Sequence, residues 1–184
     1  MTGDIQAGVI EGARQVPSPN HDARPTGIVV DLLVVHGISL PPNEFGGNYI
    51  EQLFTNCLDP GAHPYFASIC HQRVSAHALI RRDGSLVQFV NLNDRAWHAG
   101  ASVFDGRSAC NDFSIGIELE GADDVAYTPV QYQVLAQAAR AIMRAYPAIT
   151  PKRIAGHSDI APGRKTDPGA SFDWNRLHTL LNTR

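Results

Sequence analysis

The pattern of apolar and polar positions predicts several β-strands in this chain. Residues 28–35 are apolar except at Asp31, which is typical of a strand buried on both faces. Asp31 is expected to lie on an edge or to pair with an arginine. Residues 114–120 alternate strictly between apolar and other side chains, as in a strand with two different faces. Asp83-Gly84 predicts an antiparallel hairpin, because glycine readily adopts a positive φ. The expected strands span residues 28–35, 77–82, 85–90, 114–120 and 153–155.

Signals for helices separate and follow these strands. Asn48 precedes an apolar stripe with helical spacing, and Thr128 with Gln131 has the signature of a capping box. Ser171 or Asp173 would begin a final helix. This order predicts a single α/β domain with a mixed central β-sheet flanked by helices, in a chain of 184 residues. The stripe of the first helix consists of Ile50, Leu53, Phe54 and Cys57.

Composition and charge narrow the possible classes of protein. Residues 1–27 are rich in proline toward their end, and we expect an irregular arm packed on a domain formed by residues 28–184. The net charge of −3 argues against nucleic-acid binding through a basic field. The three cysteines fit no disulfide framework, so Cys57 and Cys110 are expected to be buried thiols in a reducing compartment. No apolar segment has the length of a signal peptide or membrane span, which favours a cytoplasmic protein without a membrane partner.

The most informative stretch is the loop at residues 157–169. Its prolines and glycines exclude a continuous helix or a central strand, so it is a shaped loop of the kind that often carries chemistry. It contains an imidazole, His157, a cation, Lys165, and a carboxylate, Asp167. A second imidazole, His36, follows the apolar run. The last side chain of a strand there would lie at the edge of the sheet where a functional site can form.

Two histidines and one aspartate are suitable ligands for zinc, and they leave one tetrahedral position open. An open position distinguishes a catalytic zinc from a structural one, and water activated there is a nucleophile near neutral pH. Either His36 or His157 taken alone is better explained as a polar residue at a loop edge, but the full constellation favours a catalytic site. A rival site at His71 and His77 is conceivable, although these are better explained as structural histidines.

Further residues have chemistry suited to a binding cleft. Trp97 and His98 lie in a loop, where an aromatic plane beside a hydrogen-bonding ring suits a sugar or a peptide. A capped core tryptophan is the alternative. Tyr65 either forms a wall of a cleft or covers the core.

Two carboxylates share one face of the strand at residues 114–120. Glu118 and Glu120 are two positions apart, so their side chains point the same way and alternation does not choose between them. A solvated polar face is the simpler explanation if the strand is considered alone.

Several short segments match a known family, and they run from near the start of the chain to near its end. The segments are Val16–Asn20, Leu33–His36, Ser39–Pro42, Glu44–Gly47, Val74–His77, Leu79–Gly84, Arg95–Gly100, Cys110–Gly121 and Lys165–Gly169. Together they resemble the zinc-dependent N-acetylmuramoyl-L-alanine amidases, specifically the cytoplasmic 1,6-anhydro-N-acetylmuramyl-L-alanine amidases. The set is far more specific than any one segment, and it also implies a mixed sheet covered by helices.

The resemblance implies an enzyme that hydrolyses the amide between the lactyl group of N-acetylmuramic acid and L-alanine. Residues 28–184 would form the zinc amidase domain. Glu118 matches the family's general base, which takes a proton from water and passes it to the leaving amine. Lys165 would stabilise the negative charge on the carbonyl oxygen. Arg73 and Arg107 are candidate partners for the carboxylates of the peptide stem.

The implied partner is a small-molecule muropeptide, and no obligate protein partner is inferred. A cytoplasmic amidase would act on imported fragments during peptidoglycan recycling and would indirectly affect β-lactamase induction. One alternative is a muropeptide-recognition module that binds without cutting, but the presence of all the reactive residues favours catalysis. Another is an amidase that acts on the intact wall outside the cell, which the missing signal and the unpaired cysteines oppose.

Overall fold

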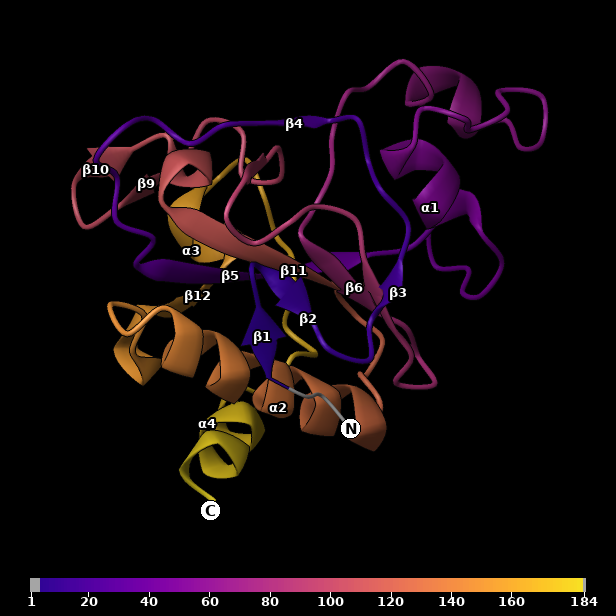
Figure 1. The fold of residues 1–184 in the computed structure, drawn as a ribbon. Coiled ribbons are helices and arrows are strands. Elements are labelled where there is room, and N and C mark those ends of the chain that lie inside the picture. Colours follow the sequence, from indigo (N-terminus) through magenta and orange to yellow (C-terminus); the bar gives the residue numbers. More distant parts are fainter. Residues whose placement is uncertain (1–3, 184) are drawn as a thin grey trace.

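The computed structural model describes residues 4–183, and within them the chain forms a mixed six-stranded sheet (Figure 1). In spatial order its strands are β12 (Ile154–Gly156), β5 (Leu32–Ile38), β11 (Ser114–Glu120), β6 (Ala78–Ile80), β7 (Leu86–Gln88) and β3 (Arg14–Gln15). The strands from β12 to β6 run parallel, β7 runs antiparallel to β6, and β3 runs parallel to β7. The predicted α/β class and mixed sheet are therefore confirmed, as is the hairpin at Asp83-Gly84.

The remaining elements are short except for two helices. The α-helices are α1 (Tyr49–Phe54), α2 (Pro129–Ala145), α3 (His157–Ile160) and α4 (Trp174–Asn182). The 3₁₀ helices are η1 (Phe66–Ser68), η2 (Cys110–Asp112) and η3 (Pro151–Arg153). The peripheral strands are β1 (Ile5–Gln6), β2 (Val9–Ile10), β4 (His21–Asp22), β8 (Arg95–Ala96), β9 (Val103–Phe104) and β10 (Arg107–Ser108). No helix among residues 4–183 is long and apolar enough to cross a membrane.

The central strand β5 lies further along the chain than its apolar run predicts. The expected strand at residues 28–35 was wrong at both ends, since Val29 is 61 % exposed and pairing extends to Ile38. The reason is that the parallel pairing with β11 determines which residues belong to the strand. Residues 28–31 are mostly apolar, but they do not pair with β11. His36 consequently lies inside the strand and not at its end.

Asp31 at the amino end of β5 forms ion pairs with arginines, as expected. Its Oδ2 lies 2.7 Å from Arg107 Nη1 and 2.9 Å from Arg153 Nη2. The Arg107 guanidinium also lies 3.8 Å from the centre of the Phe113 ring. These contacts hold Arg107 at the amino end of the strand.

Helices α2 and α4 cover one face of the sheet, as Figure 1 shows. The capping box predicted at Thr128 and Gln131 is formed, and Asp173 caps α4. The odd-numbered positions of β5 and β11 pack with α2 in one apolar cluster, where burial of side chains such as Leu33 and Ile117 stabilises the domain.

The opposite face of the sheet carries α1, α3 and long loops, and it contains the polar positions of β5 and β11. Here the expectation for Cys57 was wrong, because α1 ends at Phe54 and the chain turns at Asn56 with a φ of 62°. Cys57 is therefore exposed, whereas Cys110 is buried as expected. Two kinds of layer thus enclose the sheet: a regular helical layer on one side and a loop-rich layer on the other.

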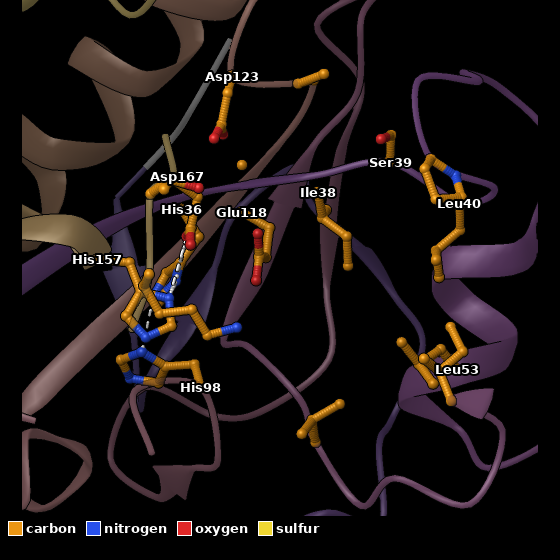
Figure 2. Close-up of a pocket in the computed structure, with 18 of the residues that line it drawn as sticks. His36, Ile38, Ser39, Leu40, Leu53, His98, Glu118, Asp123, His157 and Asp167 are labelled. Carbon is orange, nitrogen blue, oxygen red and sulfur yellow. Dashed lines mark hydrogen bonds and ion pairs between the residues drawn. The ribbon is translucent and has the colours of Figure 1, made fainter. Parts of the chain in front are cut away.

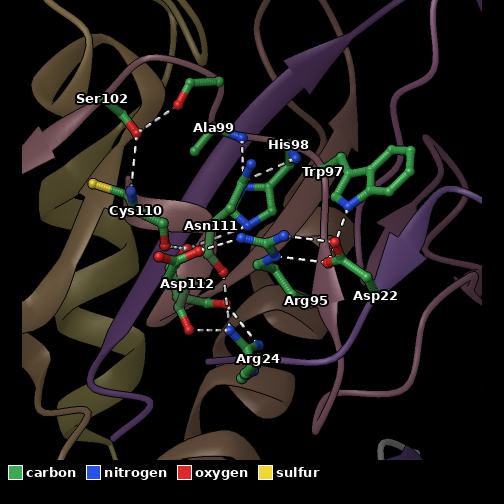
Figure 3. A network of polar contacts seen from close by, with 12 residues as sticks. Asp22, Arg24, Arg95, Trp97, His98, Ala99, Ser102, Cys110, Asn111 and Asp112 are labelled. Atoms are coloured by element: carbon green, nitrogen blue, oxygen red, sulfur yellow. Dashed lines mark hydrogen bonds and ion pairs between the residues drawn. The ribbon is translucent and has the colours of Figure 1, made fainter. Parts of the chain in front are cut away.

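The N-terminal arm is more regular than its composition predicts. It supplies the edge strand β3, and it inserts Arg24 among the loops on the open face of the sheet. The Arg24 guanidinium lies 2.8–3.2 Å from four backbone carbonyl oxygens, to which it donates hydrogen bonds (Figure 3). These acceptors belong to Leu92, Asn111, Asp112 and Ser114. The arm is thereby tied to the segments that border the centre of the sheet.

Replacing Arg24 by methionine should destabilise the fold, because carbonyl groups in its surroundings would lose their donors. We expect the free energy of unfolding in urea to fall by about 3 kcal/mol. Arg14→Met, in the same arm, is the matched control: Arg14 forms an exposed ion pair with Glu51, so the loss should stay below about 1 kcal/mol. Equal losses for the two variants would contradict this role of Arg24.

Candidate metal centre

The register of β5 and β11 brings the first two site residues together. His36 and Glu118 are directly paired positions in adjacent parallel strands, so their side chains emerge side by side on the face away from α2. Both side chains are largely buried, with residue exposures of 1 % and 8 %. Figure 2 shows them beside each other at the carboxyl ends of the strands, the usual place for a site in a parallel sheet.

The third and fourth residues come from the segment that follows β12. Gly156 pairs with Val35, so the next residue, His157, reaches the position beside His36. The loop that carries Asp167 then returns to the same place, where the backbone N–H of Ser158 donates to the Asp167 carbonyl at 2.9 Å. The segment predicted as a loop begins with the short helix α3 (His157–Ile160), so the prediction of a loop was wrong for its first four residues, because the prolines and glycines that exclude a helix lie after them. The segment nevertheless brings both of its candidate ligands to one point.

Three side-chain atoms form a compact triangle there. His36 Nδ1 and His157 Nδ1 are 3.0 Å apart, and Asp167 Oδ2 lies 3.2 Å and 3.1 Å from them. A tetrahedral zinc with bonds of about 2.0–2.1 Å separates its ligand atoms by about 3.3 Å. The size of the triangle and its set of two imidazoles and one carboxylate therefore fit zinc.

The other ring nitrogens of both histidines have partners. His157 Nε2 lies 3.2 Å from the Ala99 carbonyl oxygen, and a hydrogen on this nitrogen would leave the lone pair of Nδ1 for a metal shared with Asp167. His36 Nε2 lies 2.9 Å from His98 Nδ1. Burial lowers the pKa of His36 to about 4, which keeps the ring neutral at physiological pH and able to bind a cation.

Glu118 is a buried carboxylate with an unused acceptor. Its Oε2 is shielded from solvent and has no hydrogen-bond partner among residues 4–183. Burial, and then the charge of Asp167, raise the pKa of Glu118 well above its ordinary value, while the charge of Lys165 acts in the opposite direction. Such a carboxylate is prepared to take up a proton.

A cavity of about 850 Å³ opens above these residues. Tyr65, Trp97, His98 and Lys165 line it. His98 is nevertheless only 9 % exposed, and one of its nitrogens faces His36.

The structure does not bring the two candidate arginines into this cavity. Neither Arg73 nor Arg107 is among the lining residues in the described part of the chain. Arg107 is held by Asp31, and an Arg73 guanidinium nitrogen donates to the backbone carbonyl of His71 at 3.3 Å. Sequence position could not reveal this, because several other arginines were equally available.

The rival histidine site is not assembled either. His77 is buried, and its Nδ1 accepts a hydrogen bond from the Gly116 N–H at 2.9 Å while its Nε2 lies 3.1 Å from the Asp94 carbonyl. His71 is exposed. These contacts support the structural interpretation of His77.

Residues that the sequence did not single out also border the site. Asp123 and Asp124 follow β11 and line the cavity, and Asp123 is visible above Asp167 in Figure 2. Their position directly after a strand that ends at the site was a usable signal. Asn111 was missed because its contribution depends on tertiary contacts: its Oδ1 accepts from the N–H groups of His98 and Ala99 (Figure 3).

Comparison with known proteins shows which family the chain resembles. The profile of the N-acetylmuramoyl-L-alanine amidase family matches residues 24–170. The 1,6-anhydro-N-acetylmuramyl-L-alanine amidase AmpD of Escherichia coli K12 is 59 % identical over 178 residues, covering 97 % of each chain.

Solved structures of amidases have a similar fold. A crystal structure of a selenomethionine AmpD derivative superposes with a TM-score of 0.94 at 59 % identity, covering 96 % of this chain and 98 % of that one. The E. coli amidase AmiD, in complex with anhydro-N-acetylmuramic acid-L-Ala-D-γ-Glu-L-Lys, superposes with a TM-score of 0.60 at 29 % identity, covering 85 % of this chain and 60 % of that one. Since the matched profile spans most of the chain, including the strands and the loop that supply the site, the chain belongs to the N-acetylmuramoyl-L-alanine amidase family.

Proposed function

We propose that this protein is a zinc-dependent amidase that cleaves the amide between 1,6-anhydro-N-acetylmuramic acid and L-alanine in muropeptides. The observation that carries the proposal is the position of Glu118 beside the triangle of His36, His157 and Asp167, at the base of an open cavity. A carboxylate base beside a metal-binding set with a free side is the arrangement that hydrolysis of an amide needs.

The three triangle residues are the proposed metal ligands. Bound there, zinc would supply Lewis acidity that polarises the scissile carbonyl and acidifies water. Two neutral imidazoles and one carboxylate would compensate only part of a charge of +2, so that this acidity is retained. Both histidine rings are buried, and their Nε2 atoms contact His98 and the Ala99 carbonyl. These contacts hold the ligand atoms in place before zinc binds.

Glu118 is the proposed general base and acid. Its unpartnered oxygen is free to accept a proton from the attacking water. The pKa raised by burial then helps Glu118 to keep this proton until it is passed to the leaving amine of L-alanine.

Lys165 is the proposed stabiliser of the carbonyl oxygen. It lines the cavity, and its charge lowers the pKa of both Glu118 and His36, which supports a role near the scissile carbonyl. A cation in this position favours the state in which negative charge grows on that oxygen.

The cavity supplies binding surfaces for the rest of the substrate. Trp97 and Tyr65 offer aromatic planes suited to a sugar ring or a peptide. The preference for the anhydro sugar rests on the relatives: the chain matches AmpD over almost its full length, and the related AmiD structure contains an anhydro-N-acetylmuramic acid peptide. We further propose that the protein acts in the cytoplasm on imported muropeptides during peptidoglycan recycling, and so limits the fragments that induce β-lactamase.

Removal of metal should abolish the reaction. Purified protein incubated with 1,6-anhydro-N-acetylmuramyl tripeptide should release the peptide, as followed by mass spectrometry. Release should fall to the uncatalysed level after treatment with a chelator and return with added zinc. Unchanged turnover in the chelated protein would contradict the metal-dependent mechanism, and binding without cleavage in either state would indicate a recognition module.

Glu118→Gln should remove the base while keeping the shape of the site. We expect turnover to fall by about 10²–10⁴-fold with zinc content unchanged, because glutamine cannot take up the proton. Asp167→Ala is the contrasting variant and should lose zinc and activity together.

A strain whose only copy is Glu118→Gln should accumulate 1,6-anhydro-muropeptides, and normal levels would contradict the proposed cellular role.

The same Glu118→Gln variant should be more stable than the wild type at neutral pH when both are free of metal. The raised pKa means that the folded protein binds a proton more tightly than the unfolded chain, so stability is lost as pH rises above the ordinary glutamate value. The gain in melting temperature should therefore be present at pH 7 and disappear near pH 4. A variant less stable than wild type at pH 7 would show that the charge of Glu118 is compensated.

A further inference from the structure

The His98 ring lies between a proposed metal ligand and a serine of the central sheet. Its Nδ1 is 2.9 Å from His36 Nε2, and its Nε2 is 3.2 Å from Ser114 Oγ. Ser114 and His98 are both buried. The mechanism proposed above uses the contact with His36 only to hold the His36 ring in place, and it gives the contact with Ser114 no role.

The direction of each hydrogen bond in this series follows from its last member. The backbone carbonyl of Cys110 can only accept, and it lies 2.6 Å from Ser114 Oγ, which therefore donates its single hydrogen there. The hydroxyl oxygen then has only lone pairs to offer to His98. Consequently His98 Nε2 carries the hydrogen, and His98 Nδ1 is an acceptor.

The tautomer of His98 decides that of the proposed ligand His36. An acceptor at His98 Nδ1 requires a donor at His36 Nε2, which leaves the lone pair of His36 on Nδ1. Nδ1 is the atom that faces His157 and Asp167. The opposite tautomer of His98 would place a hydrogen against His36 Nε2 and would favour a hydrogen on His36 Nδ1, where it would block metal binding.

We propose that Ser114 and His98 are positioning residues that set the tautomer of His36, so that its Nδ1 is the metal-binding atom. This inference rests on the proposed zinc site. We call this series of hydrogen bonds from Ser114 through His98 to His36 the relay. His157 needs no relay, because its Nε2 faces the Ala99 carbonyl directly. The cavity contact first expected for His98 is thus secondary to its contact with His36.

The surrounding residues fix the ring in this place. Asn111 Oδ1 accepts hydrogen bonds from the backbone N–H groups of His98 and Ala99, at 3.1 Å and 2.7 Å. One side-chain amide therefore holds the two residues that contact the proposed ligands (Figure 3). Gly116 leaves room for the ring, since a Cβ atom there would lie 2.5 Å from His98 Nδ1.

Substitution of His98 should change zinc affinity according to the acceptor that remains. In competition with a chromogenic chelator, His98→Leu should bind zinc about 10–100-fold more weakly, the usual effect of losing such an outer contact. His98→Asn is the matched variant, because its side-chain oxygen can take the place of Nδ1 as an acceptor, and it should retain most of the affinity. Zinc binding by His98→Leu that equals the wild type, or equal losses for the two variants, would overturn the proposal.

The tautomer itself can be measured in the wild-type protein. Nitrogen NMR of the histidine rings should show His98 protonated at Nε2 and not at Nδ1, both with and without zinc, because Ser114 and not the metal sets this state. Ser114→Ala should weaken this preference. A hydrogen on His98 Nδ1 would overturn the relay even if the variants fail to fold. Failure of the wild type to bind zinc would instead refute the proposed function, and the relay would still be decided by this spectrum.

Discussion

The parallel pairing of β5 with β11 is the constraint on which the rest of the site depends. It runs over seven residues of each strand and matches Leu32 with Ser114 and His36 with Glu118. A shift by one residue would turn His36 toward the apolar cluster under α2 and leave Glu118 without its neighbour. Adding β12 on the other side of β5 in parallel register then brings His157 to the same edge. One hydrogen-bonded layer therefore positions a proposed base and two proposed ligands.

This arrangement places polar groups on a buried face of a sheet, which carries an energetic penalty unless each group is paired. The structure meets the requirement at most positions through the loop-rich layer. Asn111 holds the backbone around His98, Ser114 contacts the His98 ring, and the Ala99 carbonyl receives His157. Glu118, however, keeps one buried oxygen without a hydrogen-bond partner among the residues that the structure describes. A destabilised carboxylate at the proposed site of reaction would be a common compromise between stability and activity.

The residues of the candidate site could be predicted from the sequence better than the contacts around them. His36, His157, Asp167 and Glu118 could be found because a strand pattern, a punctuated loop and family-like segments each pointed to them, and the structure assembles all four. The ends of β5 were wrong because strand register is decided by pairing partners that hydrophobicity alone does not specify. The exposure of Cys57 depends on a backbone turn at Asn56 that the helical spacing did not reveal. His98 and Arg107 were expected to contact the substrate because of their residue types. In the fold, His98 contacts His36 and Arg107 contacts Asp31, and such tertiary contacts cannot be predicted from residue type.

The central claim is that His36, His157 and Asp167 together bind zinc at this edge of the sheet. Anomalous diffraction measured at the zinc absorption edge, on crystals of the zinc-loaded protein, tests it most directly. One strong peak is expected at about 2.0–2.2 Å from His36 Nδ1, His157 Nδ1 and an Asp167 carboxylate oxygen. A peak at other residues, or no peak at this position in zinc-loaded crystals, would contradict it.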